Sequence, residues 1–173
     1  HYAYELSKSF IEELNLPEPN YFLNVRSGSQ GAQTARIMER SERILIDERP
    51  DVVLVEGDTN SALGAALASA KLKIPVGHVE AGCRSFDKRM PEEMNRVIIA
   101  DCASIHFAAT HTCVKNLRAE GINSRSIHLT GHPIVELIYR LIESHHNRGV
   151  PGRFGVEGRE YVLLTVHREE NAD

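Results

Sequence analysis

The sequence has no tryptophan, only three cysteines and no excess of basic residues. The cysteines, Cys83, Cys102 and Cys113, are odd in number and show no C-x-x-C spacing, which argues against a disulfide framework and a cysteine-based zinc site. The net charge of −4 offers no basic surface to nucleic acid, and no apolar run approaches the length that spans a membrane. We therefore expect free thiols in a cytoplasmic protein that binds neither nucleic acid nor membranes.

Motifs for cofactors and metals are also missing. The stretch Ser-Gly-Ser-Gln-Gly at 27–31 lacks the spacing of a dinucleotide-binding loop and the Lys-Ser/Thr of a P-loop. We interpret it as a loop before an amphipathic helix, with a phosphate-binding loop as the alternative. His78-Val79-Glu80 has the H-x-E pattern of zinc deaminases, but the P-C-x-x-C of that site is absent from the sequence. We expect no metal and no redox cofactor.

What the chain does contain is a repeated alternation of short apolar runs and helical segments. Its 173 residues, 42% of them apolar and 25% charged, are enough for one core. Apolar runs at 52–55 and 74–79 flank an alanine-rich helix at 59–71, which predicts parallel strands covered by helices on both faces. Similar patterns predict strands at 21–25, 104–108, 126–129 and 161–166, and helices at 2–14, 32–48, 110–120, 133–144 and from 91 onward. The predicted fold class is α/β, a Rossmann-like parallel sheet with flanking helices.

Acidic residues follow both strands of the first strand–helix–strand unit. Asp58 comes after the first strand and Glu80 ends the second. In open parallel sheets, ligands bind beyond the carboxyl ends of the strands, so both acids are expected at that edge. A further acidic pair, Glu92 and Glu93, falls in the first turn of the helix that begins at Pro91.

Each acid also has a purely structural interpretation. Asp58 lies at a helix start, where it can cap, and a glutamate pair near a helix N-terminus is favoured by the helix dipole. Glu80 is different, because it follows a buried strand where no helix needs a cap and where a charge needs a partner. With Arg84 and Arg96 close in sequence, the three acidic positions together favour acid–base chemistry on an anionic substrate.

Four segments resemble a known family: GDTNS at 57–61, PVGHVEAGCRSFDKRMPEEMNR at 75–96, LTGHPIVE at 129–136 and VHREEN at 166–171. The family is the non-hydrolysing UDP-N-acetylglucosamine 2-epimerases, which interconvert UDP-N-acetylglucosamine (UDP-GlcNAc) and UDP-N-acetylmannosamine (UDP-ManNAc). HVEAG with a following arginine and then PEE-x-NR is a specific combination, and the match runs along essentially the whole chain. The resemblance implies two Rossmann-like lobes with the active site between them, and a homodimer that serves polysaccharide biosynthesis.

The resemblance also implies a mechanism and its residues. In the family, C2 is inverted by elimination of UDP to 2-acetamidoglucal and re-addition, which needs a general acid and a general base on different sides of the sugar. The acid–base candidates are Asp58, Glu80 and Glu92. Glu92 is chosen because it holds the first glutamate place of PEE-x-NR. The substrate-binding candidates are His167, Arg96, which can brace the carboxylates, and Arg84.

For the domain organisation we expect an N-terminal Rossmann-like lobe at 1–144, a linker at 145–160 and the first strand of a C-terminal lobe at 161–173. In the family, His1 corresponds to the histidine that ends the second strand, so we expect a fragment that lacks the first strands and most of the C-terminal lobe. Three alternatives remain: a hydrolysing epimerase, a two-lobed glycosyltransferase, and an inactive fragment of the epimerase fold. In bacterial relatives, the region matching Gln30 helps to form a regulatory site for UDP-GlcNAc.

Overall fold

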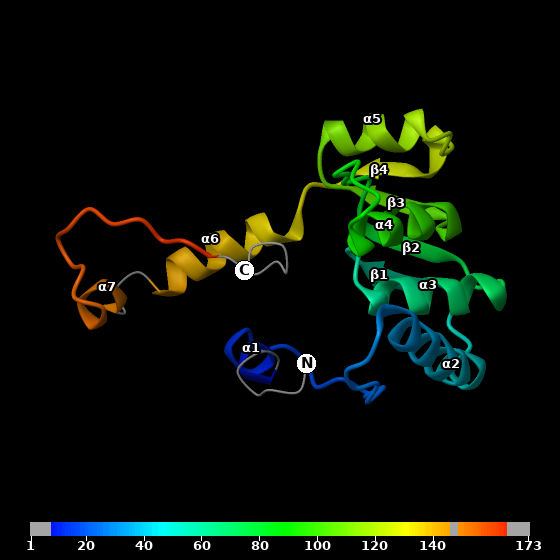
Figure 1. Cartoon of the computed structure of the whole chain (residues 1–173), viewed down its shortest axis with the longest axis horizontal. Coiled ribbons are helices and arrows are strands. Elements are labelled where there is room, and N and C mark those ends of the chain that lie inside the picture. Colours follow the sequence, from blue (N-terminus) through cyan, green and yellow to red (C-terminus); the bar gives the residue numbers. More distant parts are fainter. Residues whose placement is uncertain (1–7, 146–148, 166–173) are drawn as a thin grey trace. The chain divides into compact units, whose positions relative to one another are not determined.

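The computed structural model describes residues 8–145 and 149–165. The chain divides into two compact units, His1–His132 and Pro133–Asp173. The first unit is built on a four-stranded sheet with helices packed against it, as Figure 1 shows. The predicted α/β class is confirmed.

The sheet is entirely parallel, and its strands lie in sequence order. They are β1 (Val53–Glu56), β2 (Val76–Ala81), β3 (Ile105–Ala108) and β4 (Ile127–Leu129). Parallel neighbours need crossover segments, and these are supplied here by helices. The helices of this unit are α1 (Lys8–Glu13), α2 (Gln30–Glu48), α3 (Asn60–Lys71), α4 (Pro91–Cys102) and α5 (His111–Ala119), with a short 3-10 turn at Ser124–Ser126.

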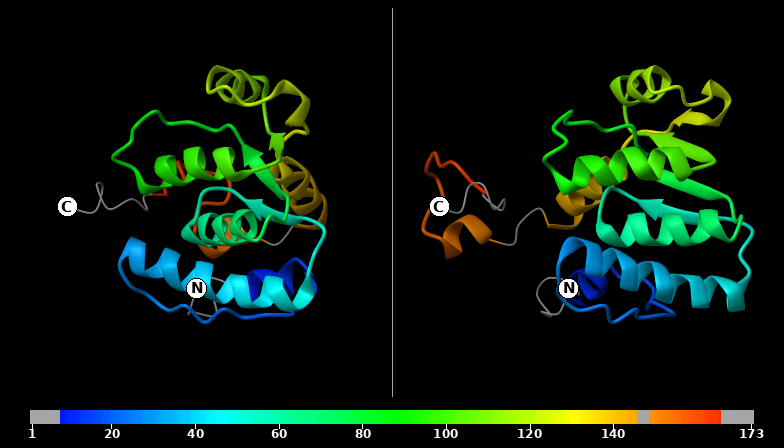
Figure 2. Two further views of the ribbon diagram at one scale, coloured as in Figure 1. Left: turned by 90° about the vertical axis from the view of Figure 1, so that its right-hand side faces the viewer. Right: turned by 45° about the vertical axis from the view of Figure 1, so that its right-hand side comes forward.

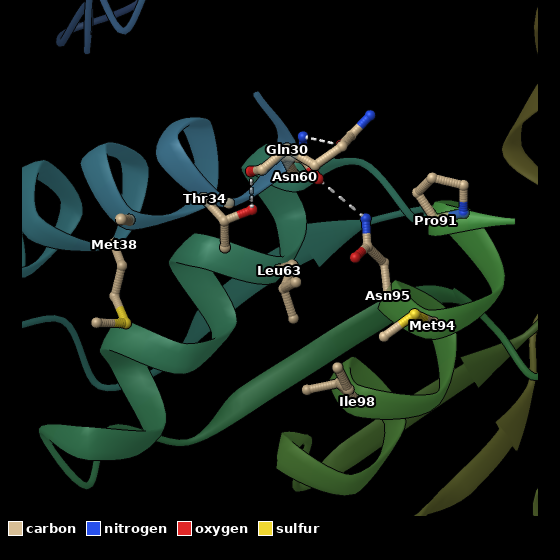
Figure 3. A pocket seen from close by; sticks show the side chains of 11 residues that line it. Gln30, Thr34, Met38, Asn60, Leu63, Pro91, Met94, Asn95 and Ile98 are labelled. Atoms are coloured by element: carbon tan, nitrogen blue, oxygen red, sulfur yellow. Dashed lines mark hydrogen bonds between the residues drawn. The ribbon is translucent and has the colours of Figure 1, made fainter. Parts of the chain in front are cut away.

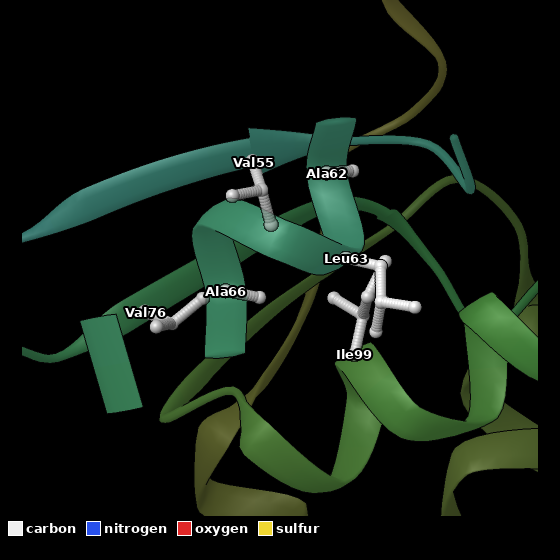
Figure 4. Packing of buried hydrophobic residues seen from close by; sticks show 6 residues of the cluster. All are labelled: Val55, Ala62, Leu63, Ala66, Val76 and Ile99. Atoms are coloured by element: carbon white, nitrogen blue, oxygen red, sulfur yellow. The ribbon is translucent and has the colours of Figure 1, made fainter. Parts of the chain in front are cut away.

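The core lies between the sheet and the crossover helices. One cluster joins β1 and β2 to α3 and α4, and Figure 4 shows its six buried residues, Val55, Ala62, Leu63, Ala66, Val76 and Ile99. A second cluster joins β2 and β3 to α4 and α5 and is centred on Leu117, which is fully buried. The two clusters hold the carboxyl ends of neighbouring strands in one fixed arrangement.

Helix α3 is rich in small residues, and this allows close packing against α2, as Figure 2 shows. A Cβ atom on Gly64 would lie 2.6 Å from Cγ2 of Ile37. Glycine inside a helix costs about 1 kcal/mol relative to alanine. The close approach of α2 compensates for that cost, because a larger residue at this position could not be accommodated without a shift.

Two expectations about strands differ from the structure of the first unit. No strand forms at 21–25, because the carbonyl groups of Leu23, Asn24 and Val25 accept hydrogen bonds from the Arg36 and Arg40 side chains of α2 instead of from a neighbouring strand. Strand β1 is not covered on both faces within the described residues. Its burial alternates along the strand, and Leu54 is 62% exposed.

The second unit contains α6 (Pro133–His145) and α7 (Val150–Arg153), so the predicted linker at 145–160 includes one helical turn. The strand predicted at 161–166 is not formed over the described residues 161–165, where Val162 and Leu163 are 92% and 90% exposed. A strand needs a neighbour for its backbone hydrogen bonds, and none of the described residues supplies one. Residues 166–173 lie outside the described part, so the domain division stays a prediction. In the described part of the chain, no helix is long and apolar enough to cross a bilayer.

Candidate active site

The acids predicted at the strand ends lie next to each other. Gly57 follows β1 in a left-handed conformation, with φ +70°, and turns the chain so that Asp58 stands at the start of α3. A Cβ atom on Gly57 would lie 3.7 Å from Oε2 of Glu80, so the Glu80 carboxylate lies over the turn that carries Asp58. The sheet therefore brings together two residues that are separated by a whole helix in the sequence.

Glu80 has an unusual backbone conformation. Its φ is +65°, and the pairing of β2 with β3 shifts register between Val79 and Ala81, so Glu80 is the extra residue of a β-bulge. A residue other than glycine in this region costs on the order of 1–3 kcal/mol, and such residues concentrate at functional sites. The bulge redirects the Glu80 side chain at the edge of the sheet where the carboxylates gather.

Arg96 of α4 joins two of the carboxylates. Its guanidinium lies 2.5 Å from Oδ2 of Asp58 and 3.2 Å from Oε2 of Glu93. Burial by itself disfavours the charge, but the attraction of Asp58 and the hydrogen bonds to both carboxylates raise the pKa of Arg96. The bracing role predicted for Arg96 corresponds to this contact with Asp58.

The two glutamates at the start of α4 lie in different environments. Glu93 is only 3% exposed and accepts hydrogen bonds from Ser85, Phe86 and Arg96. Burial tends to raise its pKa, but these hydrogen bonds outweigh burial and lower it. Glu92 is exposed, and no hydrogen bond or ion pair is described for its side chain within residues 8–145 and 149–165. The acid–base role of Glu92 stays a prediction. Of the two carboxylates, that of Glu92 is the one accessible to solvent.

The backbone of the turn after β1 is held by two residues to which sequence reasoning gave no role in the site. The imidazole of His78 donates from Nε2 to the Gly57 carbonyl at 2.9 Å, and Asn95 donates from Nδ2 to the Asp58 carbonyl at 2.7 Å. His78 is 1% exposed, and burial lowers its pKa to about 4, so it is neutral at physiological pH. Their places in HVEAG and PEE-x-NR were the available signal, but a buried hydrogen bond to a backbone carbonyl cannot be read from a motif.

Two histidines remain to be placed. His132, which follows β4, lies with Nε2 3.5 Å from Oε1 of Glu80 and was another residue that sequence reasoning did not single out. It belongs to the LTGHPIVE segment, which was the signal for it. His167, the predicted substrate contact, lies outside the described residues.

Arg84 does not join the site carboxylates. Its guanidinium, 1% exposed, makes a paired contact with the carboxylate of Glu120 at the end of α5, with both nitrogen–oxygen distances 2.7 Å. It therefore links the turn after β2 to α5, and its predicted substrate contact stays a prediction. Beside it, the sulfur atoms of the free thiols Cys83 and Cys113 are 3.5 Å apart. Burial and this hydrogen bond raise the pKa of Cys83 to about 12, so it stays protonated.

A pocket of about 400 Å³ is lined by residues of α2, α3 and α4. Figure 3 shows the amide side chains of Gln30, Asn60 and Asn95 around its polar end, with Leu63 and Met94 on its apolar wall. The amide of Asn60 donates to Gln30 and receives a hydrogen bond from Asn95, so the pocket and the Asp58 turn share a polar network. Within the described residues, no group of three His, Cys, Asp or Glu side chains could hold a metal ion.

The arrangement is suited to proton transfer on an anionic substrate. It offers two carboxylates of different surroundings at one sheet edge, Asp58 paired with a guanidinium and Glu80 beside an imidazole. Pairs of acids held in unlike environments are the usual means of separating a general acid from a general base. The exposed Glu92 adds a third carboxylate that lies at the start of α4.

Comparisons with known proteins show the family to which the chain belongs. The family model described as UDP-N-acetylglucosamine 2-epimerase matches residues 1–173. Over 176 residues the chain is 46% identical to a UDP-N-acetylglucosamine 2-epimerase of Methanococcus maripaludis, and the match covers 100% of this chain and 48% of the relative. Over 173 residues it is 36% identical to the UDP-2,3-diacetamido-2,3-dideoxy-D-glucuronate 2-epimerase of Pseudomonas aeruginosa, with 100% and 48% covered.

A relative of known structure has the same sequence identity to this chain, 46%. The UDP-GlcNAc 2-epimerase of Methanocaldococcus jannaschii, crystallised in complex with UDP-GlcNAc and UDP, superposes with a TM-score of 0.92 at 46% identity. The superposition covers 99% of this chain and 48% of that one. The chain thus spans about half the length of the relatives that it matches.

Proposed function

The chain belongs to the UDP-N-acetylglucosamine 2-epimerase family, and from that premise we propose that it carries the acid–base residues of an isomerase that interconverts UDP-GlcNAc and UDP-ManNAc. The observation that supports this most strongly is the pairing of Asp58 with Arg96 in the turn over which the strained Glu80 lies. Folding requires neither a bulged glutamate nor a carboxylate–guanidinium pair at this edge.

The proposed reaction inverts C2 of the sugar through elimination and re-addition of UDP. One carboxylate removes the C2 proton while the bond from C1 to the diphosphate oxygen breaks, which gives 2-acetamidoglucal and UDP. Return of a proton to the opposite face of C2, with re-addition of UDP at C1, gives the epimer. The candidates for these proton transfers are Asp58, Glu80 and Glu92. The candidates for substrate contacts are His167, Arg96 and Arg84.

Further features of the whole protein are proposed on family membership. We propose a cytoplasmic homodimer that serves polysaccharide biosynthesis. We also propose that residues 1–144 form an N-terminal lobe, that 145–160 act as a linker and that 161–173 open a second lobe. Light scattering on the complete gene product tests the dimer, because a monomeric mass contradicts it.

A different nucleotide sugar is the second candidate. The Pseudomonas aeruginosa relative is named for UDP-2,3-diacetamido-2,3-dideoxy-D-glucuronate, and it matches over the whole chain. The relatives from Methanococcus maripaludis and Methanocaldococcus jannaschii that are named for UDP-N-acetylglucosamine are 46% identical, against 36% for the Pseudomonas relative, and this supports UDP-GlcNAc as the substrate. Parallel assays with both sugars separate the two candidates.

The deciding experiment incubates the complete gene product with UDP-GlcNAc in deuterium oxide and follows C2 by NMR. The expected result is UDP-ManNAc with solvent deuterium at C2. Release of free N-acetylmannosamine supports a hydrolysing epimerase instead, and transfer of the sugar with C2 unchanged supports a glycosyltransferase. Recovery of UDP-GlcNAc without deuterium overturns the proposal.

A further inference from the structure

The two adjacent glutamates at the start of α4 have opposite surroundings, since Glu93 is buried and Glu92 is exposed. The carboxylate of Glu93 accepts four hydrogen bonds, three at Oε2 and one at Oε1. A carboxylate that is buried and bonded in this way has little capacity left for a substrate proton. Glu92, one residue earlier, faces solvent.

The hydrogen bonds of Glu93 hold the loop between β2 and α4. Oε2 accepts from the Ser85 backbone at 2.8 Å and from the Ser85 hydroxyl at 3.0 Å, and Oε1 accepts from the Phe86 backbone at 3.1 Å. Phe86 has φ +60°, and the residue is 74% exposed. An aromatic residue in this backbone region is strained and persists only where its surroundings fix it. Glu93 supplies that fixation.

The fourth hydrogen bond connects the same carboxylate to the acid–base residues. Nη1 of Arg96 lies 3.2 Å from Oε2 of Glu93, while Nη2 lies 2.5 Å from Oδ2 of Asp58. The guanidinium is planar, so fixing one of its nitrogen atoms also fixes the direction of the other. Glu93 therefore determines how Arg96 meets Asp58.

We propose that Glu93 is a positioning residue, whose buried carboxylate fixes the Ser85–Phe86 loop and the orientation of Arg96 toward Asp58, while Glu92 is left to meet the substrate. The expected effect of Glu93 on turnover rests on the proposed function. The fixation of the loop does not rest on it, because the hydrogen bonds from Ser85 and Phe86 can be tested in the absence of any activity.

A double-mutant cycle tests the effect on turnover. In the complete gene product, Glu93→Gln is expected to lower kcat about tenfold or more with a smaller change in KM, because misplaced acid–base groups act on the transition state. In the background of Arg96→Lys, the same substitution is expected to change kcat less than about threefold, since it acts through Arg96. Equal effects of Glu93→Gln in both backgrounds overturn the proposal.

Hydrogen exchange tests the structural part and supplies the control. Glu93→Gln is expected to speed exchange of the Ser85 and Phe86 amides, whereas Glu92→Gln leaves them unchanged. If Glu93→Gln does not fold, Ser85→Ala removes no charge and only the hydroxyl's hydrogen bond to Glu93 and the one it accepts from the Asp87 backbone. It is expected to give a smaller fall in kcat. Unchanged exchange in a folded Glu93→Gln protein overturns the proposal. An inactive wild type with faster exchange in Glu93→Gln overturns only the proposed function.

Discussion

The turns that follow β1 and β2 differ sharply from the turn that follows β3, although the three strands belong to one parallel sheet. Left-handed residues mark both places: Gly57 in the turn after β1, Glu80 in the bulge near the end of β2, and Gly82 directly after β2. We call these two segments, Gly57–Asp58 and Glu80–Gly82, the acidic edge. After β3 the chain passes through a buried alanine to Thr110, whose side chain caps α5.

The difference separates what folding requires from what chemistry requires. A helix that follows a strand needs only a capping side chain, and Thr110 meets that need without charge or strain. The acidic edge also caps its helix, through Thr59, and in addition holds a strained glutamate and an ion pair. The strained glutamate and the ion pair are not needed to form the helix, and the strain costs energy. Such features indicate selection for function.

The largest expected effect comes from removing a charge at the acidic edge. Asp58→Asn or Glu80→Gln is expected to lower turnover in the complete gene product by at least about 100-fold, the usual scale of general acid–base catalysis. Thr110→Ala, in the turn after β3, is the control and is expected to keep the wild-type rate. Near-normal turnover in both acidic-edge variants would remove the functional distinction between the turns.

The next effect concerns His78, which donates a hydrogen bond to the Gly57 carbonyl of the acidic edge. Its pKa is lowered to about 4 by burial, so the unfolded chain binds the proton more readily than the folded one. Above the pKa of histidine in the unfolded chain, about 6.5, the folded state keeps its full stability. As the pH falls from there toward 4, the free energy of unfolding decreases by roughly 3 kcal/mol.

Urea unfolding at a series of pH values measures this dependence. Wild type is expected to lose stability between about pH 6.5 and 4, and His78→Gln is expected to show a flatter profile over the same interval because it removes the titrating group. Glu93 also has a lowered pKa and contributes at the acid end of the profile in both proteins. Identical slopes in the two proteins contradict the assignment to His78.

The contrast between the turns also shows which parts of the fold and of the site can be predicted from the sequence. Periodicity predicted the four strands of the sheet and the helices that cross between them, because apolar patterning reports burial directly. It failed at 21–25, where the arginine side chains of α2 bind the backbone carbonyls, a contact between segments that no local pattern encodes. The strand-end pattern located Asp58 and Glu80, and the resemblance chose Glu92 over Glu93. Neither could show that the Glu93 carboxylate is buried while Glu92 is exposed, because that depends on which of the two points into the protein.

A smaller effect tests the close packing of the acidic edge. Gly82 and Gly121 have nearly equal φ values, +86° and +87°, but a Cβ on Gly82 would lie 2.4 Å from the Cys113 carbonyl oxygen, whereas Gly121 has open space. Gly121→Ala therefore measures backbone strain alone, about 1 kcal/mol, and Gly82→Ala adds a steric clash of about 1–3 kcal/mol. Both are read from the free energy of unfolding. Equal losses would show that the turn after β2 is not closely packed.

The smallest effect uses one substitution at both kinds of turn. Thr59 and Thr110 each accept a hydrogen bond from the backbone three residues later, both at 3.2 Å. Replacing either by alanine is expected to lower the free energy of unfolding by about 1 kcal/mol.

Turnover is expected to separate these two variants, although their stability does not. Thr59 directly follows Asp58, whose carbonyl is held by Asn95, so a looser cap of α3 moves the carboxylate. Thr110 caps α5 and touches none of the acid–base candidates. A lower kcat in Thr59→Ala with an unchanged kcat in Thr110→Ala assigns the effect to geometry at the acidic edge. A matching fall in both would mean that turnover follows general stability, and the distinction between the turns would then be one of charge alone.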